Sequence, residues 1–315
     1  MWSVLFAGGF SYQQVRLAVM SEEQQAQNKF RFQLVYLIPI LASIVFGLAC
    51  GYLLLPQPQS SAPPVTPISG SSGSAAVGSA IYFVVLVAIS ATIFYILLRR
   101  RSKKIIHGLI VVAMTAASLL LSFYYLNTLL AYFPIIDTLL VLVTLSLIIT
   151  VLFDLAIFRL GSIPKNAAVL AVGGALGIFF GFAIPLWSAV LILVFLAVYD
   201  VFAVYRGPVG KIAQSSEGLD QLRGLSYAFK DIEMGLGDLV FYSMLTGSML
   251  FYFVDSYHLP FGILPCLVSI VGITAGSTIT LFMLERRGIF PGLPFPIMLG
   301  LAGGLIMGLV ILPLL

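Results

Sequence analysis

The sequence predicts an all-α membrane protein that crosses the bilayer nine times. Of its 315 residues, 60% are hydrophobic and only 9% are charged, whereas a soluble domain carries about 25% charged residues. Apolar runs of about 20 residues, the length of one crossing, recur along the whole chain. The basic residues fall in the short gaps between these runs. We therefore expect one polytopic membrane domain, residues 1–315.

The elements follow from the apolar runs in order. A polar segment, residues 1–32, precedes the first run and is expected to lie in the cytoplasm or at the membrane interface; its apolar start lacks a basic region, so a removed signal peptide is not expected. The predicted spans cover residues 33–55, 79–98, 105–127, 135–157, 167–185, 186–206, 234–254, 261–284 and 292–314. Residues 56–78, rich in Pro, Ser and Gly, predict a flexible external loop. Residues 207–233 form the predicted cytoplasmic loop between spans six and seven.

The basic residues predict the orientation. All 16 Lys and Arg side chains fall in the gaps on one side of the nine predicted spans. The positive-inside rule places that side in the cytoplasm, so the N-terminus is predicted to be cytoplasmic and the C-terminus external. The net charge of +4 does not indicate nucleic-acid binding, because the charges lie in these gaps and not along a basic stripe.

Two aspartates interrupt the apolar pattern. Asp200 lies near the end of the sixth span, six residues before Arg206, and Asp238 lies five residues after Glu233 in the seventh. At 1.5 Å per helical residue both are roughly 7–9 Å from the cytoplasmic boundary. An ionisable group in hydrocarbon is costly and is by default a candidate functional residue. We therefore predict that Asp200 and Asp238 form a catalytic pair.

Paired carboxyl groups can perform acid and base catalysis together. Two carboxylates held close cannot both ionise cheaply, so one stays protonated while the other takes a proton from water. Such chemistry requires no metal and no cofactor, and we predict neither. Other membrane proteases fit less well, because the chain has no His-Glu-x-x-His zinc motif and neither of its two histidines lies deep in a span.

Glycines recur at helical spacing in two spans. Gly173, Gly177 and Gly181 repeat every four residues in the fifth span, and a second stripe follows in the ninth at Gly300, Gly304 and Gly308. Small residues at this spacing let helix backbones touch, so both stripes predict tight helix packing. Asp154 and Asp137, near the ends of the fourth span, are expected to be interfacial or structural.

Three motifs in order resemble those of the presenilin family of GxGD intramembrane aspartyl proteases. Tyr199-Asp200 resembles the Tyr-Asp of the family's sixth span, and Gly235-Leu236-Gly237-Asp238 resembles the Gly-x-Gly-Asp of the seventh. Before the last span, Pro291-Gly292-Leu293, continued by Pro294, is similar to Pro-Ala-Leu, with Gly in place of Ala. The resemblance is specific because it combines all three motifs at matching spans, whereas Gly-x-Gly-Asp alone is a weak signal.

The resemblance implies a fold, an activity and a set of partners. It implies a presenilin-like fold and hydrolysis of peptide bonds within the transmembrane helices of single-span proteins, with Asp200 and Asp238 catalytic. The residues that bind substrate or shape the site would be Tyr199, Gly235, Leu236, Gly237, Pro291, Gly292, Leu293 and Pro294. The predicted orientation matches presenilins and is opposite to that of signal peptide peptidases. The loop at 207–233 is shorter than the self-cleaved loop of eukaryotic presenilins, so we expect an intact chain that is active without accessory subunits, with a homo-oligomer left open.

Other interpretations of these residues remain open. Tyr199 could serve helix packing alone, and Pro291 to Pro294 could be an ordinary helix start. A transporter or channel could also use the two aspartates as an ion or proton site between broken helices. The ordered motifs, and the lack of a visible inverted repeat between the chain halves, favour the protease.

Overall fold

The structure is a computed structural model that describes most of the predicted membrane domain. It covers residues 33–58, 63, 65, 73–99, 103–133, 138–205, 226–229, 232–257, 261–287 and 290–311. The predicted N-terminal segment at 1–32 and most of the predicted loops at 56–78 and 207–233 lie outside these residues.

The described residues form nine α-helices, one 3-10 helix and one pair of strands. The helices are η1 (Leu34–Leu37), α2 (Ile38–Tyr52), α3 (Gly73–Arg99), α4 (Lys103–Leu130), α5 (Thr138–Phe158), α6 (Ser162–Ala183), α7 (Leu186–Tyr205), α10 (Leu236–Tyr257), α11 (Ile263–Arg287) and α12 (Pro294–Ile311), and the strands are β1 (Ser226–Phe229) and β2 (Ile232–Gly235). Nine segments are long and apolar enough to cross a membrane, the first combining η1 with α2. The predicted number of spans is confirmed for the described residues.

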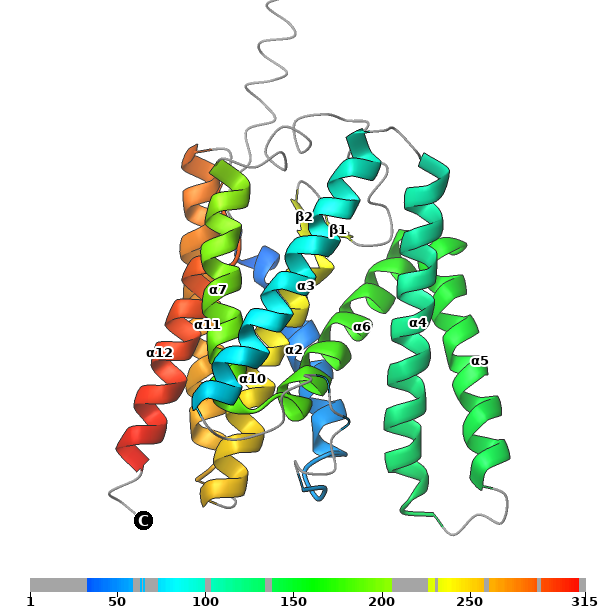
Figure 1. The fold of residues 1–315 in the computed structure, drawn as a ribbon, viewed down its shortest axis with the longest axis horizontal. Helices are drawn as coiled ribbons and strands as arrows, with labels where there is room; N and C mark the ends of the chain where they lie inside the picture. The colour runs from blue at the N-terminus through cyan, green and yellow to red at the C-terminus, as the bar shows by residue number, and fades with distance from the viewer. Residues whose placement is uncertain are drawn as a thin grey trace, which may run out of the picture.

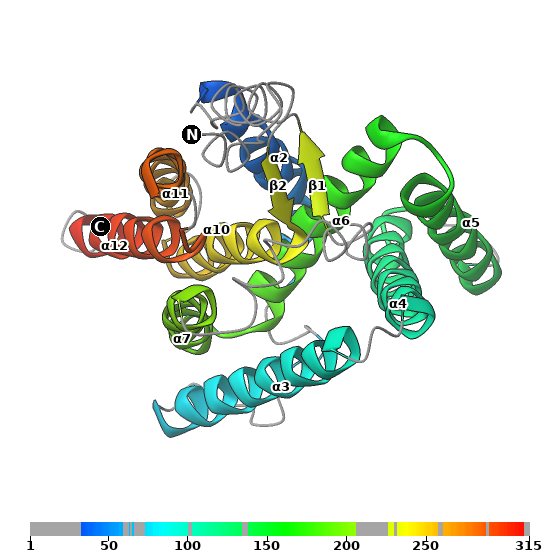
Figure 2. The same cartoon turned by 90° about the horizontal axis from the view of Figure 1, so that it is seen from above.

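Helix α10 lies at the centre of the molecule, surrounded by the other spans (Figures 1 and 2). It contacts α2, α6, α7, α11 and α12. Within its span, 72% of the residues are buried inside the protein, more than in any other described span. Helices α4 and α5 form a pair that packs on α6, and α3 lies at the edge beside α7. The helix that carries Asp238 is therefore the core of the fold.

The two glycine stripes hold α10 in place. A Cβ atom built on Gly181 would lie 2.7 Å from the backbone nitrogen of Ser248 in α10, so α6 and α10 touch through their backbones. On the other side of α10, Gly304 of α12 lies against the Met249 side chain. A Cβ atom built on Gly304 would lie 2.9 Å from the Met249 sulfur. Small residues permit this approach. The prediction of tight packing at both stripes is confirmed.

Several helix boundaries differ from the sequence prediction, and one pair of strands was not predicted. Helix α3 begins at Gly73, so residues 73–78, which were predicted to belong to the external loop, are helical. Strands β1 and β2 were not predicted; they lie at the end of the predicted cytoplasmic loop and pair antiparallel, with Ser226 opposite Gly235 and Phe229 opposite Ile232. Strand β1 contacts α6, and β2 leads directly into α10. The residues before Asp238 thus change from strand to helix within a few positions.

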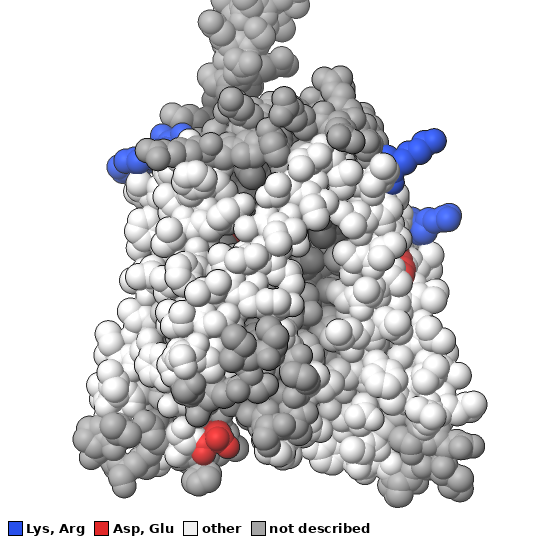
Figure 3. Space-filling view, viewed as in Figure 1, with Lys and Arg blue, Asp and Glu red and all other residues white. Residues whose placement is uncertain are grey.

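Charge is distributed unevenly over the surface. In Figure 3 the visible Lys and Arg side chains lie towards the end of the molecule at which β1 and β2 are drawn in Figure 1. The sides of the molecule in this view are almost free of charge, as expected of a surface that faces lipid. The prediction that this charged end is cytoplasmic stays a prediction.

Candidate active site

The first aspartate meets the segment that precedes α12. Asp200 lies five residues before the end of α7, and its Oδ2 accepts a hydrogen bond of 3.0 Å from the backbone N–H of Leu293. The Leu293 carbonyl accepts the first hydrogen bond of α12, from Ile297 at 3.0 Å. Leu293 thus begins the helix, and its N–H is free to bind outside it. The amino end of a helix carries partial positive charge and favours a nearby carboxylate.

The second aspartate lies against the same segment. Asp238 is in the first turn of α10. A Cβ atom built on Gly292 would lie 3.1 Å from Oδ2 of Asp238 and 3.6 Å from its Cγ. Residue 292 therefore contacts the carboxyl group, and only a small residue fits there without displacing it.

The two carboxyl groups are close to each other as well as to this segment. They lie near enough to interact electrostatically, and the Gly292–Leu293 backbone contacts both. The Tyr242 hydroxyl donates a 3.0 Å hydrogen bond to the Gly292 carbonyl. Since Tyr242 follows Asp238 by four residues, both side chains lie on one face of α10. The segment is therefore held by α7 at Leu293 and by α10 at Gly292.

Comparisons with known proteins identify the fold. No family model matches the chain. A crystal structure of a presenilin family intramembrane aspartate protease in space group C222 superposes with a TM-score of 0.61 at 19% identity, over 87% of this chain and 98% of that one. A structure of such a protease in space group P2 gives 0.60 at 21% identity, over 89% and 100%. The chain has the presenilin-family fold. The resemblance inferred from the motifs is thus confirmed, and the protein is an integral, multi-pass membrane protein.

A curated relative supports the presenilin likeness over a shorter stretch. Presenilin-B of Dictyostelium discoideum is 29% identical over 127 residues, which is 38% of this chain. The match spans only 25% of that relative. The similarity in sequence therefore covers part of each protein, whereas the shared presenilin fold covers almost all of this one.

The other residues predicted for the site are distributed around the carboxyl pair of this presenilin fold. Pro291 and Leu293 are buried, and Pro294 begins α12. Gly235 ends β2, while Leu236 and Gly237 open α10 immediately before Asp238. Tyr199 is 37% exposed on α7. Successive side chains on a helix point about 100° apart, so Tyr199 and Asp200 face different directions. Tyr199 makes no hydrogen bond among the described residues.

A polar pocket opens beside Asp238 and includes residues that the sequence did not single out. It has a volume of about 240 Å³ and lies between α2, α10 and α11. Its lining consists of Ile40, Met234, Asp238, Tyr242, Ser277, Thr280, Leu281, Leu284, Phe290 and Gly292. Asp200 is not among them, so the pocket reaches the pair from the Asp238 side.

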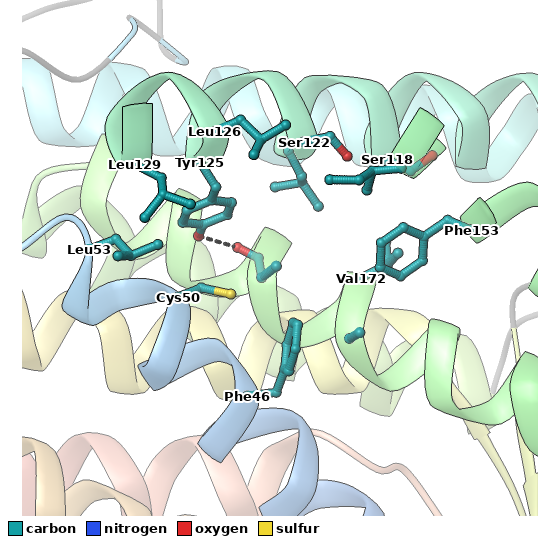
Figure 4. A pocket seen from close by; sticks show the side chains of 14 residues that line it. Phe46, Cys50, Leu53, Ser118, Ser122, Tyr125, Leu126, Leu129, Phe153 and Val172 are labelled. Atoms are coloured by element: carbon teal, nitrogen blue, oxygen red, sulfur yellow. Dashed lines mark hydrogen bonds between the residues drawn. The ribbon is translucent and has the colours of Figure 1, made fainter. Parts of the chain in front are cut away.

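A second cavity lies apart from the aspartates and is almost wholly apolar. Figure 4 shows this space of about 180 Å³ between α2, α4, α5 and α6. The hydroxyl of Tyr125 at its wall donates to the Ala175 carbonyl at 2.9 Å and is therefore already satisfied. An apolar cavity of this size stays dry. Its chemistry does not suit hydrolysis, and we assign it no part in the site.

Asp154 has a structural partner and lies outside this site. Its Oδ2 accepts a 2.7 Å hydrogen bond from the Thr115 hydroxyl and so links α5 to α4. This contact agrees with the structural role expected for Asp154, whereas Asp137 lies outside the described residues.

Proposed function

We propose that the protein is an intramembrane aspartyl endopeptidase of the GxGD type. The observation that carries this proposal is the meeting of Asp200 and Asp238 at the Gly292–Leu293 backbone, between membrane-spanning helices. A carboxyl group inside a membrane is costly in free energy, so its presence there marks a functional residue. The presenilin-family fold supports the general activity.

The mechanism needs one water and one shared proton. The ionised carboxylate accepts a proton from water as the water oxygen bonds to the carbonyl carbon of the scissile peptide. The protonated carboxyl group donates its proton to the carbonyl oxygen, which gives a neutral gem-diol. When the diol collapses, the protonated carboxyl group gives its proton to the amide nitrogen, the carbon–nitrogen bond breaks, and the ionised carboxylate takes a proton from a diol hydroxyl, so the pair is again singly protonated. The protonation states belong to the pair and not to either residue.

The substrate must be unwound before it can be cut. A transmembrane helix satisfies all its backbone groups internally, which shields the scissile carbonyl. Strand β2 ends at Gly235, three residues before Asp238, and its partner β1 occupies one of its two edges. A substrate segment added to the other edge of β2 would lie extended and beside the pair. Pro291 to Pro294 and Gly235 to Gly237 would bound this space.

The partners follow from the predicted orientation. We propose single-span membrane proteins with an external N-terminus as substrates, cut from within the lipid bilayer. We expect no accessory subunit to be needed, and we expect the intact chain to act without cleavage of its own loop at 207–233. A homo-oligomer is compatible with this proposal.

Replacing either aspartate tests the proposed function. We expect Asp200→Asn and Asp238→Asn each to lower cleavage of a single-span peptide by at least about 10³-fold, because a catalytic acid–base group contributes about 10²–10⁴-fold and each variant removes the shared proton. The assay uses purified protein in lipid vesicles, and thermal unfolding checks that both variants fold. Asp154→Asn is the matched control and should cleave normally, because Asp154 contacts Thr115 and lies outside the site.

The result that contradicts the proposal also identifies the rival class. If the wild type cleaves no single-span peptide over a range of pH and lipid, while ion flux into vesicles is lost in Asp200→Asn, the protein is a transporter or channel. Substantial cleavage by either Asn variant would exclude the shared-proton mechanism.

A further inference from the structure

Two hydroxyl groups of α11 face the pocket beside Asp238 without being satisfied by the protein. Ser277 and Thr280 line this pocket together with Asp238 and Tyr242. Their side chains are 2% and 8% exposed. The Oγ of Ser277 and the Oγ1 of Thr280 are buried and have no hydrogen-bond partner among the described residues. A buried polar atom without a partner is costly and therefore calls for an explanation.

Two other hydroxyls on the same helix bond to its backbone. Thr274 donates to the Ile270 carbonyl at 2.7 Å, and Thr278 donates to the Thr274 carbonyl at 2.8 Å. This bond to the residue four positions earlier is available to any Ser or Thr in a helix. Ser277 and Thr280 do not make it, although Thr278 lies within two residues of both. Both residues line the pocket.

The pocket is large and polar enough to hold water. Its volume of about 240 Å³ has room for several water molecules, and a bound water needs two to four polar partners. The Asp238 carboxyl group, the Tyr242 hydroxyl and the two α11 hydroxyls provide them. No hydrogen bond of regular geometry joins Ser277 to Tyr242, but the two hydroxyls lie close enough to interact. The rest of the lining is mostly apolar side chains, so water in the pocket is bound by these polar groups.

We propose that Ser277 and Thr280 hold the hydrolytic water against Asp238, an inference that rests on the proposed function. One hydrogen of the water goes to the ionised carboxylate of the pair during attack. The other is bound by an α11 hydroxyl oxygen, which directs a lone pair of the water at the scissile carbonyl carbon. The hydroxyls neither gain nor lose a proton overall. They act as positioning residues and supply water to a site that is enclosed by lipid-facing helices.

Substitutions at Thr280 separate the hydroxyl from the shape of the side chain. We expect Thr280→Val, which keeps the volume and removes the hydroxyl, to lower kcat about tenfold while KM stays within about twofold, as expected from loss of one hydrogen bond in the reacting complex. Thr280→Ser keeps the hydroxyl and should restore most of kcat. Ser269→Ala is the matched control, because Ser269 is also a buried and unpartnered hydroxyl of α11 but does not line the pocket.

A second measurement reports water in the pocket without any protease activity. In a chain whose two cysteines are removed by Cys50→Ala and Cys266→Ala, Thr280→Cys should react with a charged methanethiosulfonate reagent in lipid vesicles. Ser269→Cys, about three turns earlier in α11, should not react. This test is independent of cleavage, so it separates failure of this inference from failure of the proposed function.

Each other outcome overturns the inference. An unreactive Thr280→Cys means a dry pocket, whatever the protease assay gives. A reactive Thr280→Cys with unchanged kcat in Thr280→Val means that water enters but is not positioned by this hydroxyl. A changed KM or cleavage position in Thr280→Val would assign the pocket to a substrate side chain. If the wild type cleaves nothing, the positioning role falls with the proposed function, while the labelling still decides whether the pocket holds water.

Discussion

At the scale of single residues, Gly292 is the point at which the two aspartates are brought together. Its backbone carbonyl accepts a 3.0 Å hydrogen bond from the Tyr242 hydroxyl, and its Cα lies against the Asp238 carboxyl group. The backbone N–H of the next residue, Leu293, donates to Asp200. The related family motif has Ala at this position, whereas this chain has Gly. A methyl group at 3.1 Å from Oδ2 of Asp238 is tight but can be relieved by a shift of a few tenths of an ångström.

We therefore predict graded effects of side-chain size at position 292. Gly292→Ala should retain cleavage to within about tenfold, because a small displacement of a catalytic group costs much less than the roughly 10²-fold loss expected for a 1 Å shift. Gly292→Val should lose at least about 10²-fold, because its branched side chain occupies the place of the carboxyl group. Initial rates with a single-span peptide measure both. Equal activity in Gly292→Val and the wild type would show that this segment does not control the pair.

The sequence predicted the two aspartates and the segment from Pro291 to Pro294 beside them, but not the polar groups of the pocket. Asp200 and Asp238 stand out because a carboxyl group contrasts with an apolar run, and their equal distance from the charged gaps predicted that they meet. Tyr242 and Thr280 do not stand out, because hydroxyl-bearing residues are ordinary in spans. The acceptor on Gly292 is a backbone carbonyl, which no side-chain pattern reveals. Long-range contacts such as Leu293 with Asp200 depend on the packing of α7 and α12, which local sequence does not encode.

At the scale of elements, the fold depends on how closely α6 and α12 approach α10. The Gly177 and Gly181 positions leave no room for a side chain, because the α10 backbone occupies the space that a Cβ would take. Substitution there must push α6 away from the helix that carries Asp238. The effect should therefore reach both stability and activity, although neither glycine lies in the site.

We predict that Gly181→Leu destabilises the protein by several kcal/mol, since overpacking a tight contact costs about 1–3 kcal/mol and more where backbone must move. The measurement is the thermal unfolding midpoint in detergent. Gly108→Ala in α4 is the matched control. Because a Cβ at Gly108 would meet nothing within 4 Å, this change should stabilise the helix slightly, as expected for Gly→Ala in a helix. A Gly181→Leu midpoint equal to that of Gly108→Ala would contradict close packing of α6 on α10.

The strand pair explains where element prediction from sequence failed. Spans are recognised by apolar runs of about 20 residues, whereas β1 and β2 have four residues each. Such short strands leave little periodic signal beside a polar loop. The helix boundaries were approximate for a similar reason, since Gly73 to Gly78 contain only small and apolar residues without charge, which suit both a loop and a helix. The number of spans was predictable because the bilayer sets their length.

At the scale of the whole molecule, hydropathy predicted the number of spans but not their neighbours. The α10 span has the lowest mean hydropathy of the nine, which agrees with its place at the centre, whereas the mean hydropathy of α3 does not indicate that it lies at the edge. The glycine stripes of α6 and α12 were the best available signal, and they predicted close contacts without naming the partner helix. The charge pattern, in contrast, concerns the whole chain and predicts how the protein sits in its membrane.

The orientation decides which substrates the proposed protease can accept. The aspartates lie nearer the end of the molecule at which α10 begins and the visible basic side chains gather. If this end is cytoplasmic, a single-span protein with an external N-terminus presents the C-terminal part of its span to the aspartates. An inverted orientation would require substrates that run the opposite way through the bilayer. The orientation is therefore a test of the substrate class as well as of the topology.

Two single-cysteine positions at opposite ends of the molecule test the predicted orientation, each in a chain that carries Cys50→Ala and Cys266→Ala. Asp255 is exposed near the far end of α10, and Arg159 is exposed just after α5, at the basic end. On intact cells, a membrane-impermeant maleimide should label Asp255→Cys directly and Arg159→Cys only after permeabilisation, because all 16 basic residues lie on the predicted cytoplasmic side. The cysteine-free chain controls for background. The reverse pattern would invert the topology and assign the protein substrates with a cytoplasmic N-terminus, while the geometry of the carboxyl pair would be unaffected.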